Sequence, residues 1–495
     1  MHERLAHTLR TYLADIGRDG GAMTPAVYDT AIAMRFRPQW SDSHTIDWLL
    51  SQQRSDGGWD DPYVPRARTV PTLSAMLALA PRIGVDHEAI RAGAQFLTDQ
   101  EVLWSAADTD ELPAGVELIV PWLLRSAHAQ AIHLPVTYQG LREVSERRIN
   151  LIRGQPLRAG SPVAYSWEAL GVVADPCTLD ADGSIASSPA ATVAWLASAE
   201  SNPKLADACA AAQRYLEGAH TATGTAIPGI LPTAWKINRF EQSFGLYFLM
   251  VAGLLHDPSF EDLVDQQINN LRRALRPDGI GYSDTFLSDG DDTAAVIAVL
   301  AALGLPYDIG MLQRYRVGEH YTSYVYELQA ARSVTARAIH ALALVGADHD
   351  DSVNYLLRYQ LEDGRWGPDK WHTSWVYGTA HALFALAVAD RHACCSIDKA
   401  VHGICAVQHT NGGWGERRAN LEETSYIILA LHALRRTGRL PANGHTALRR
   451  ACAWVRANPN ALVADMPWIA KSAYRPRRLV EMIACIGQVL AQREE

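Results

Sequence analysis

The residues best suited to chemistry are three aspartates within one short segment, Asp289, Asp291 and Asp292. An apolar segment over 294–303 predicts a helix, so the carboxylates lie at its N-terminus, where one can cap the helix and the helix dipole favours negative charge. Crowded carboxylates repel one another, and at least one is expected to keep its proton near neutral pH. In a dry site this acid can protonate an alkene carbon.

Two other readings of the acidic segment are a metal-binding loop and a solvated acidic turn. A calcium loop of the EF-hand type would need Glu at its twelfth position, where Leu300 stands. Water must be excluded if the segment is catalytic, because it would intercept the carbocation.

The bulk composition indicates a globular, largely helical protein. The 495 residues suggest two or three domains, and abundant Ala and Leu favour helices. Acidic residues outnumber basic ones, 54 to 45, so nucleic acid is not an expected partner. Seven cysteines without a CxxC pair predict reduced thiols in a cytoplasmic enzyme.

The longest apolar stretch covers 244–255 and is shorter than the roughly 20 residues that span a bilayer. We expect a buried helix there and no transmembrane segment. The alternative for this stretch is a weak contact with a membrane surface, where an apolar substrate enters. No signal peptide is evident at the start.

A Q-x-x-x-G-x-W pattern occurs three times and ends at Trp59, Trp366 and Trp414. The last two copies lie 48 residues apart, the length of two helices and two loops, which predicts a curved or closed array of helix pairs. We expect the Gln amide to bond free backbone groups at helix ends and the Trp to pack over the turn. A segment rich in Gly, Thr and Pro over 217–235 predicts a domain boundary.

The acidic segment, read as Asp289-x-Asp291-Asp292-Thr293-Ala294, resembles the D-x-D-D-T-A motif of class II terpene cyclases. The tryptophan repeats resemble the QW motifs of the same superfamily. Further matches are Val27-Tyr-Asp-Thr-Ala31, the segment over 112–124, Trp167-Glu168, the segment over 183–192, Asp369-Lys-Trp-His-Thr-Ser374 and Trp468-Ile-Ala-Lys-Ser-Ala-Tyr-Arg-Pro476.

This resemblance implies an all-α fold of two α-α barrel domains, as in bacterial copalyl diphosphate synthases. A β domain would comprise residues 1–20 and 231–495, and an inserted γ domain residues 21–230. The implied reaction is cyclisation of geranylgeranyl diphosphate to a bicyclic diterpene diphosphate. Ionising class I enzymes need a D-D-x-x-D motif and a second Asn/Asp-Ser/Thr-Glu motif, and neither is found in the sequence. The diphosphate would therefore be retained, and the product would pass to a separate class I synthase or a phosphatase.

The resemblance also assigns roles. Asp291 would be the proton donor, with Asp289 and Asp292 tuning it, and Asp292 remains an alternative helix cap. Relatives have an Asn on the helix near 329–342 that holds the acid; here Thr335 or His340 would substitute. The terminating base is left open between His340, His372, a tyrosine and a trapped water. The aromatic candidates for stabilising the cation are Trp167, Tyr321, Tyr324, Trp371, Trp375 and Tyr377.

The polar end of the substrate would need Mg²⁺ and basic residues. An acidic segment of the family corresponds to Asp108, Asp110, Glu111 and Glu117, whose hard oxygen ligands suit Mg²⁺. A solvated helix start is the alternative there. The candidates for binding the diphosphate are Arg153, Arg158, Lys471, Tyr474 and Arg475.

Four alternatives follow from the same residues. Farnesyl diphosphate would give a drimenyl diphosphate by the same mechanism. A zinc prenyltransferase subunit would need an Asp/Cys/His zinc site, which Cys177 and Cys394-Cys395 do not supply. A glycosidase would need two separated carboxylates flanking the sugar. A non-enzymatic helical-repeat protein would leave its ligand unchanged.

Overall fold

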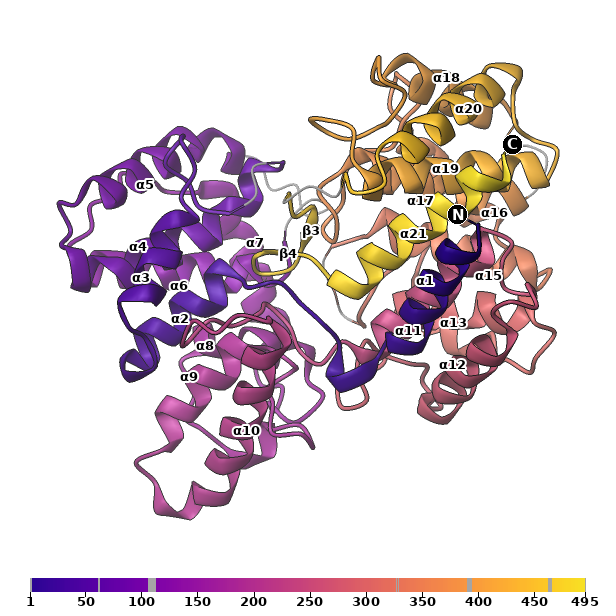
Figure 1. Cartoon of the computed structure of the whole chain (residues 1–495). Coiled ribbons are helices and arrows are strands. Elements are labelled where there is room, and N and C mark those ends of the chain that lie inside the picture. The colour runs from indigo at the N-terminus through magenta and orange to yellow at the C-terminus, as the bar shows by residue number, and fades with distance from the viewer. Residues whose placement is uncertain are drawn as a thin grey trace.

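The structure is a computed structural model that describes residues 2–60, 63–105, 113–325, 327, 329–389, 394–461 and 465–494. Helices dominate these residues, and the strands form two short antiparallel pairs. Figure 1 shows two lobes side by side, with both chain termini on the same lobe. The prediction of an all-α fold is confirmed.

The elements follow one another along the chain as α1 (His2–Asp15), α2 (Val27–Phe36), α3 (Ser43–Ser51), α4 (Thr69–Ile83), α5 (Glu88–Asp99), α6 (Val116–Ala129), α7 (Gln139–Ile152), α8 (Trp167–Leu170), α9 (Pro189–Ala199), α10 (Ala206–Ala222), α11 (Asn238–Val251), α12 (Glu261–Ala274), α13 (Gly290–Ala302), α14 (Gly310–Gln313), β1 (Arg316–Val317), β2 (His320–Tyr321), α15 (Arg332–Leu344), α16 (Asp350–Arg358), α17 (Trp375–Val388), α18 (Cys394–Ala406), α19 (Leu421–Arg436), α20 (Ala442–Ala457), β3 (Trp468–Ile469), β4 (Ala473–Tyr474) and α21 (Arg477–Arg493).

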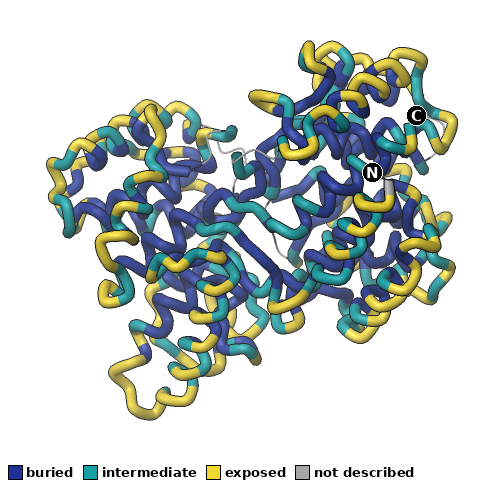
Figure 2. Tube along the Cα trace, in the orientation of Figure 1, coloured by how far each residue is buried: buried dark blue, intermediate teal, exposed yellow. Residues whose placement is uncertain are grey.

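The large lobe consists of α1 and α11–α21 and is an α-α barrel. Its inner helices are α11, α13, α15, α17, α19 and α21; each packs against the next, and α21 packs against α11, so they close a ring. Helices α12, α16, α18 and α20 lie outside this ring, and α1 packs on α21. Inner helices such as α13 and α17 are apolar nearly all round, as expected for helices buried on every side. Figure 2 shows this contrast between buried inner and exposed outer helices.

The small lobe consists of α2–α10, and its inner helices also form a ring. Helices α2, α4, α6, α8 and α9 pack in that order, and α9 returns to α2. One apolar core surrounds Trp59 and Ile119, and another surrounds Trp195 and Tyr215. Phe286, which comes from the large lobe, is part of the second core, so the two lobes share buried surface.

The predicted role of the tryptophan repeats is confirmed by their hydrogen bonds. Gln360 donates to the carbonyl of Gly364 in its own turn and to that of Ser396 in the next outer helix, at 2.8 and 2.9 Å. Trp366 donates from Nε1 to the carbonyl of Leu356 near the end of the preceding helix, at 2.8 Å. The copies at Gln53 and Gln408 repeat these bonds. Each repeat therefore ties the carbonyl end of one outer helix to the start of the next.

A threonine completes each repeat. The backbone N–H of Trp366 donates to Thr379 Oγ1, and this hydroxyl donates back to the carbonyl of Trp366. The acid motif contains the same device, because Thr293 makes this pair of bonds with the backbone of Ile280. The motif's Thr thus anchors the start of α13 to the loop before it.

The predicted buried helix over 244–255 corresponds to α11, whose residues from Glu241 to Val251 are all buried. Among the described residues, no helix combines the length and apolar character needed to cross a bilayer.

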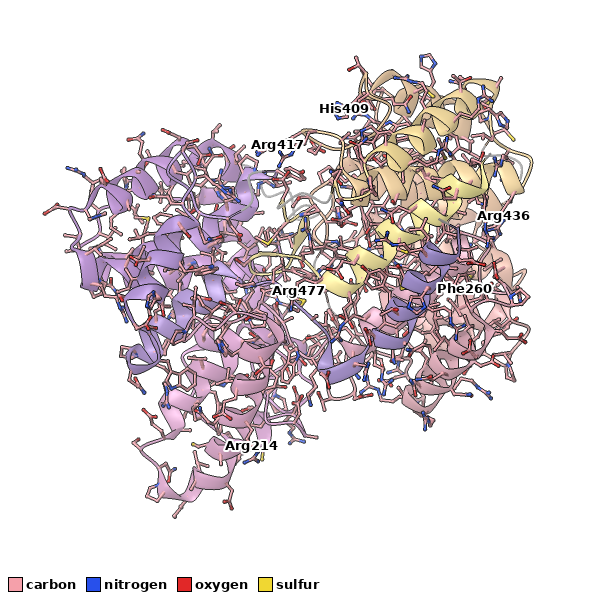
Figure 3. The ribbon with its side chains drawn as sticks, in the orientation of Figure 1. Arg214, Phe260, His409, Arg417, Arg436 and Arg477 are labelled. Carbon is pink, nitrogen blue, oxygen red and sulfur yellow. The ribbon has the colours of Figure 1, made fainter. Side chains whose placement is uncertain are left out.

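Segments of the large lobe reach into the small one at several points. Arg477 at the start of α21 donates to the carbonyl of Ala222 at the end of α10, at 2.9 Å, and Figure 3 labels it at the junction of the lobes. The loop before α13 contacts the small lobe through Tyr282, which donates to the carbonyl of Ala186, and through Phe286. The antiparallel β3–β4 hairpin does the same at its tip.

Replacing Trp366 by Ala is expected to lower the free energy of unfolding by about 3–5 kcal/mol, because it empties a large buried site and removes a helix-to-helix bond. Urea unfolding followed by circular dichroism measures this. Trp375→Ala is the matched control: Trp375 is only partly buried, and its ring lies beneath Arg365, so a clearly smaller loss is expected. Equal losses of unfolding free energy in both variants would contradict the proposal that Trp366 ties neighbouring helices together.

Candidate active site

The acid motif starts α13, and Asp289 is its N-cap. One carboxyl oxygen of Asp289 accepts from the backbone N–H groups of Asp291 and Asp292, at 3.0 and 2.8 Å. These are backbone donors that an N-terminal turn would otherwise leave unpaired. The cap is therefore Asp289, and Asp292, the other candidate, is free for other contacts.

Asp292 is buried at the cavity wall and hydrogen-bonded to Ser243 of α11. Burial raises the pKa of Asp292 to about 7, and the Ser243 hydroxyl opposes that rise. Burial, together with the charge of Asp292, holds the pKa of Asp289 well above its ordinary value. The expectation that crowding keeps protons on this cluster near neutral pH agrees with both directions.

Asp291 faces outward from the other two and pairs with Arg337 of α15. The guanidinium grips it with two bonds, Nε to Oδ1 at 2.5 Å and Nη2 to Oδ2 at 3.0 Å. The side chain of Arg337 is 0% exposed, whereas that of Asp291 is 15% exposed. Burial raises the pKa of Asp291, and the Arg337 charge lowers it. Asp291 is thus a carboxyl that lines the cavity, and the Arg337 guanidinium beside it can stabilise the carboxylate that remains after proton transfer.

Arg337 is itself held by the inner helices. Its guanidinium lies 4.4 Å from the Phe244 ring and donates to Tyr377 Oη at 3.1 Å. It also donates from Nη1 to the ring of His381, at 3.1 Å to Nδ1. Burial and the Arg337 charge hold the pKa of His381 well below its ordinary value, so this imidazole is a neutral acceptor. Burial raises the pKa of all three carboxyls, and the single Arg337 cation cannot balance three negative charges, so the cluster as a whole keeps protons near neutral pH.

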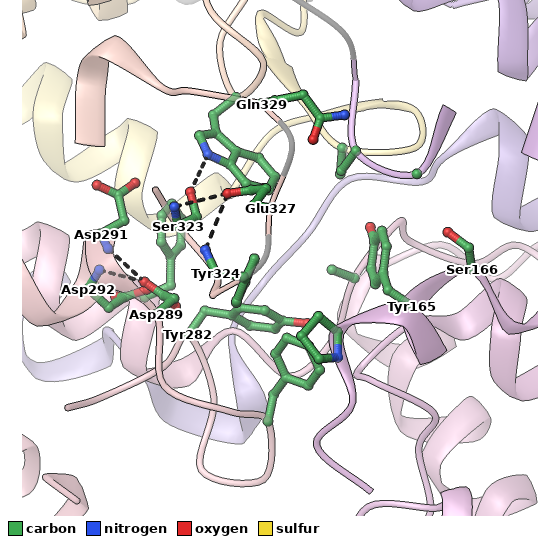
Figure 4. Close-up of a pocket in the computed structure, with 18 of the residues that line it drawn as sticks. Tyr165, Ser166, Tyr282, Asp289, Asp291, Asp292, Ser323, Tyr324, Glu327 and Gln329 are labelled. Atoms are coloured by element: carbon green, nitrogen blue, oxygen red, sulfur yellow. Dashed lines mark hydrogen bonds between the residues drawn. The ribbon is translucent and has the colours of Figure 1, made fainter. Parts of the chain in front are cut away.

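A cavity opens in front of Asp291, and residues of both lobes line it. Figure 4 shows the three aspartates at one side of it and Tyr165 and Ser166 of the small lobe at the other. Aromatic side chains cover much of the wall: Tyr165, Phe240, Tyr282, Phe286, Tyr324, Trp371, Tyr377, Trp468 and Tyr474. Such faces attract a carbocation without reacting with it.

Of the six aromatic residues proposed from the sequence, Tyr324, Trp371 and Tyr377 line this cavity. The other three do not. Trp167 is buried in the second core of the small lobe, and Tyr321 is buried in the barrel. Trp375 points to Arg365, with 4.4 Å between the guanidinium and the ring. For these three the prediction is wrong, because the sequence does not report which way a ring points.

The candidates for holding the acid also need correction. Thr335 Oγ1 accepts from the backbone N–H of Tyr321 and donates to its carbonyl, which is the same pair of bonds that Thr379 and Thr293 make. His340 is bonded to Tyr247, at 2.8 Å from Nδ1 to Oη, and burial lowers its pKa to about 3. Arg337 is the residue that holds Asp291, and the sequence interpretation missed it.

The candidate base His372 is buried behind the cavity wall. Its ring stacks on Tyr377 with 4.2 Å between centroids, and burial lowers its pKa. Neither His372 nor His340 lines the cavity, and no histidine among the described residues does. Of the candidates for the terminating base, the hydroxyl of a lining tyrosine and a trapped water therefore remain.

The basic residues expected at the diphosphate are placed differently from the prediction. Arg153 and Arg158 are exposed and follow the end of α7. Lys471 is buried in an ion pair with Glu168, 2.7 Å apart, and Arg475 donates to the carbonyl of Asp465. Tyr474 does line the cavity. Among the residues that the structure describes, Arg148 of α7 is the basic residue that lines the cavity.

Of the four acids proposed for a metal, Asp108, Asp110 and Glu111 lie outside the described residues. Glu117, on α6, lines the cavity and is 3.4 Å from Arg148. Its Oε2 is buried and has no hydrogen-bond partner among the described residues. Burial raises the pKa of Glu117, and Arg148 opposes this. Within the described part of the chain, no group of three or more His, Cys, Asp or Glu side chains is arranged to hold a metal ion.

An acidic group at the wall of an aromatic cavity, between two α-α barrels, defines a cyclase that starts its reaction with a proton. The squalene-hopene cyclase C-terminal domain family matches residues 327–430. A (+)-kolavenyl diphosphate synthase from Herpetosiphon aurantiacus is 40% identical, over 96% of this chain and 95% of the relative. A labda-7,13-dienyl diphosphate synthase from Streptomyces clavuligerus is 30% identical, over 84% of this chain and 81% of the relative.

Among solved structures, an ent-copalyl diphosphate synthase from Streptomyces platensis matches with a TM-score of 0.78 and 27% identity, covering 99% of both chains. The chain belongs to the class II terpene cyclases, as the sequence motifs predict. It is an enzyme, with the fold of α-α barrels that the resemblance implied.

Proposed function

We propose that the protein cyclises geranylgeranyl diphosphate to a bicyclic diterpene diphosphate and leaves the diphosphate group attached. The observation that carries this proposal is the position of Asp291. Its carboxyl lines an aromatic cavity, and the buried guanidinium of Arg337 forms an ion pair with it. The relatives, named as synthases of kolavenyl, labdadienyl and copalyl diphosphates, support the substrate class.

In the proposed reaction Asp291 gives its proton to the terminal double bond of the prenyl chain. The tertiary cation that results is attacked by the next double bond, and a second closure gives the bicyclic cation. Loss of one proton from carbon then forms an alkene. One proton enters and one leaves, so substrate and product are isomers. The Arg337 guanidinium stabilises the Asp291 carboxylate left by the first step.

The two lobes fix the direction of the substrate. The acid belongs to the large lobe, whereas Arg148 and Glu117 of the cavity wall belong to the small lobe. An anionic diphosphate at the small lobe places the hydrocarbon end at the acid. The guanidinium of Arg148 is suited to phosphate because its N–H groups match phosphate oxygens in pairs.

We further propose that Mg²⁺ accompanies the diphosphate. Glu117 would hold it, because its Oε2 is a buried carboxylate oxygen on the cavity wall without a partner among the described residues. Asp108, Asp110 and Glu111 stay candidate ligands. The ion would neutralise part of the diphosphate charge. Glu117→Gln is expected to raise the Mg²⁺ concentration needed for half-maximal activity, which a Mg²⁺ titration measures.

Replacing Arg148 by Gln is expected to raise KM about 10- to 100-fold with a smaller change in kcat, because a charge-assisted hydrogen bond to the bound diphosphate is lost. Steady-state kinetics measures both constants. The matched controls are Arg153→Gln and Arg158→Gln, which remove exposed charges from the same region and should leave KM unchanged. A KM that rises in the controls but not in Arg148→Gln would place the diphosphate elsewhere.

The decisive test incubates the protein and Mg²⁺ with geranylgeranyl or farnesyl diphosphate, followed by phosphatase and gas chromatography–mass spectrometry. A bicyclic C20 alcohol is expected. A cyclic product from farnesyl diphosphate alone would identify a sesquiterpene cyclase, and linear alcohols from both would overturn the proposal. Because the product keeps its diphosphate, the proposal requires a separate reaction that removes it, by a class I synthase or a phosphatase.

A further inference from the structure

The β3–β4 hairpin is joined to the large lobe by backbone hydrogen bonds, whereas its tip contacts the small lobe. The N–H of Ile469 donates to the carbonyl of Trp371, and that of Thr373 donates to the carbonyl of Pro467. The tip, residues 470–472, enters the small lobe. There the hydroxyl of Ser472 and the N–H of Ala473 both donate to Asp60, at 2.6 and 2.7 Å.

Lys471 at this tip makes a buried ion pair. Its Nζ lies 2.7 Å from Glu168 Oε1 and 2.7 Å from Ser188 Oγ, and the side chains of Lys471 and Glu168 are both 0% exposed. Glu168 Oε1 also accepts from the hydroxyl of Tyr28, at 2.7 Å. Lys471 therefore makes two hydrogen bonds to protein groups, and it does not line the cavity.

The residues beside Lys471 on the hairpin do line the cavity. Trp468, Ala470 and Tyr474 form part of its wall. Tyr165 of the small lobe also lines it, and the Lys471 ammonium lies 4.3 Å from the Tyr165 ring. A small shift of the hairpin tip would thus move aromatic faces contributed by both lobes.

We propose that the Glu168–Lys471 pair positions this aromatic wall and thereby determines which cyclic diphosphate forms, rather than binding the diphosphate. This inference rests on the proposed function. Carbocations that close different rings differ little in energy, so the wall that folds the prenyl chain selects among them. A directional ion pair fixes one hairpin position where apolar packing alone would permit several. Misplacement by about 1 Å is enough to change such reactions strongly.

The test compares Lys471→Met, Glu168→Gln and the double variant. Each single change leaves a buried group without its partner, and both are expected to lower Tm. The double variant replaces both members of the ion pair by neutral groups of similar size and is expected to regain much of the Tm, because neutral pairs of similar volume replace buried ion pairs well. In the double variant the ratio of main to minor products, measured by gas chromatography–mass spectrometry, is expected to fall about threefold or more, and KM is expected to stay nearly unchanged.

The matched control is Arg68→Met with Asp56→Asn, which removes a bidentate pair of the small lobe that does not line the cavity. It should lower Tm and keep the product ratio. Two outcomes overturn the inference: an unchanged product ratio in the double variant, or a tenfold rise in its KM with unchanged products, which would make Lys471 a diphosphate ligand.

A crystal structure of the double variant supplies a readout that does not depend on the substrate. The rings of Trp468 and Tyr474 are expected to be displaced by about 1 Å or more. Unmoved rings would overturn the inference even if the wild-type protein cyclised neither prenyl diphosphate, a result that would separately overturn the proposed function.

Discussion

Asp291→Asn is expected to lower the rate of cyclisation by at least about 10³-fold, the largest effect of any substitution in this chain. The amide keeps the shape of the carboxyl but has no acidic proton, and the other two carboxyls of the motif, which also line the cavity, are held by other contacts. Asp289 is occupied as the cap of α13, and Asp292 is buried against Ser243. Product formation from geranylgeranyl diphosphate, followed by gas chromatography–mass spectrometry, measures the loss.

The control for this substitution is Asp265→Asn, which removes an exposed carboxylate from the outer helix α12 and should leave the rate unchanged. Binding of the linear substrate by Asp291→Asn is expected to persist and can be followed through the fluorescence of the lining tryptophans Trp371 and Trp468. Full activity in Asp291→Asn would remove this residue as the acid and, with it, the proposed mechanism.

Arg337→Gln is expected to lower kcat about 10²-fold and to move the alkaline limb of the pH–rate profile to higher pH. Arg337 lowers the pKa of Asp291, so its removal raises that pKa. Activity requires protonated Asp291 and is lost as pH rises through its pKa; a higher pKa therefore extends activity upward in pH. The same change makes Asp291 a weaker acid, which slows proton transfer to carbon.

Arg337→Lys separates charge from geometry. It keeps the cation but loses the two-pronged grip on Asp291, and an intermediate kcat is expected with a smaller shift of the pH profile. A pH profile in Arg337→Gln that coincides with that of the wild-type protein would show that the ion pair does not set the acidity of Asp291. Circular dichroism checks that both variants are folded.

The sequence was sufficient for the fold class and the acid motif because both depend on local pattern. The turn and tryptophan of each repeat sit where an outer helix ends, and the aspartates directly precede an apolar helix. Arg337 was missed although a signal exists. It lies between Ala336 and Ala338 in the middle of a buried inner helix, and a buried guanidinium requires a carboxylate partner.

The polar end of the cavity was less predictable because it depends on where α7 ends and which way it faces. Arg148 lies within α7 and reaches the cavity, whereas Arg153 is at its C-terminal end and is exposed. Lys471 was matched by motif, yet its ammonium is neutralised by Glu168, a residue 303 positions away. Pairings over such separations are set by tertiary structure and are not visible in a single sequence.

The arrangement of α1 has a consequence for how the chain folds during synthesis. α1 packs against α21, so the first and last helices of the chain are neighbours. The small lobe lies between them in the sequence and contains all of its own ring helices, so its ring can form before α21 is made, and Phe286 and the tip of the β3–β4 hairpin join it later. The large barrel has a high contact order, because its ring closes only after α21 is made. Until then α1 and the half-built ring expose apolar faces, which makes this interval the period of greatest risk for aggregation.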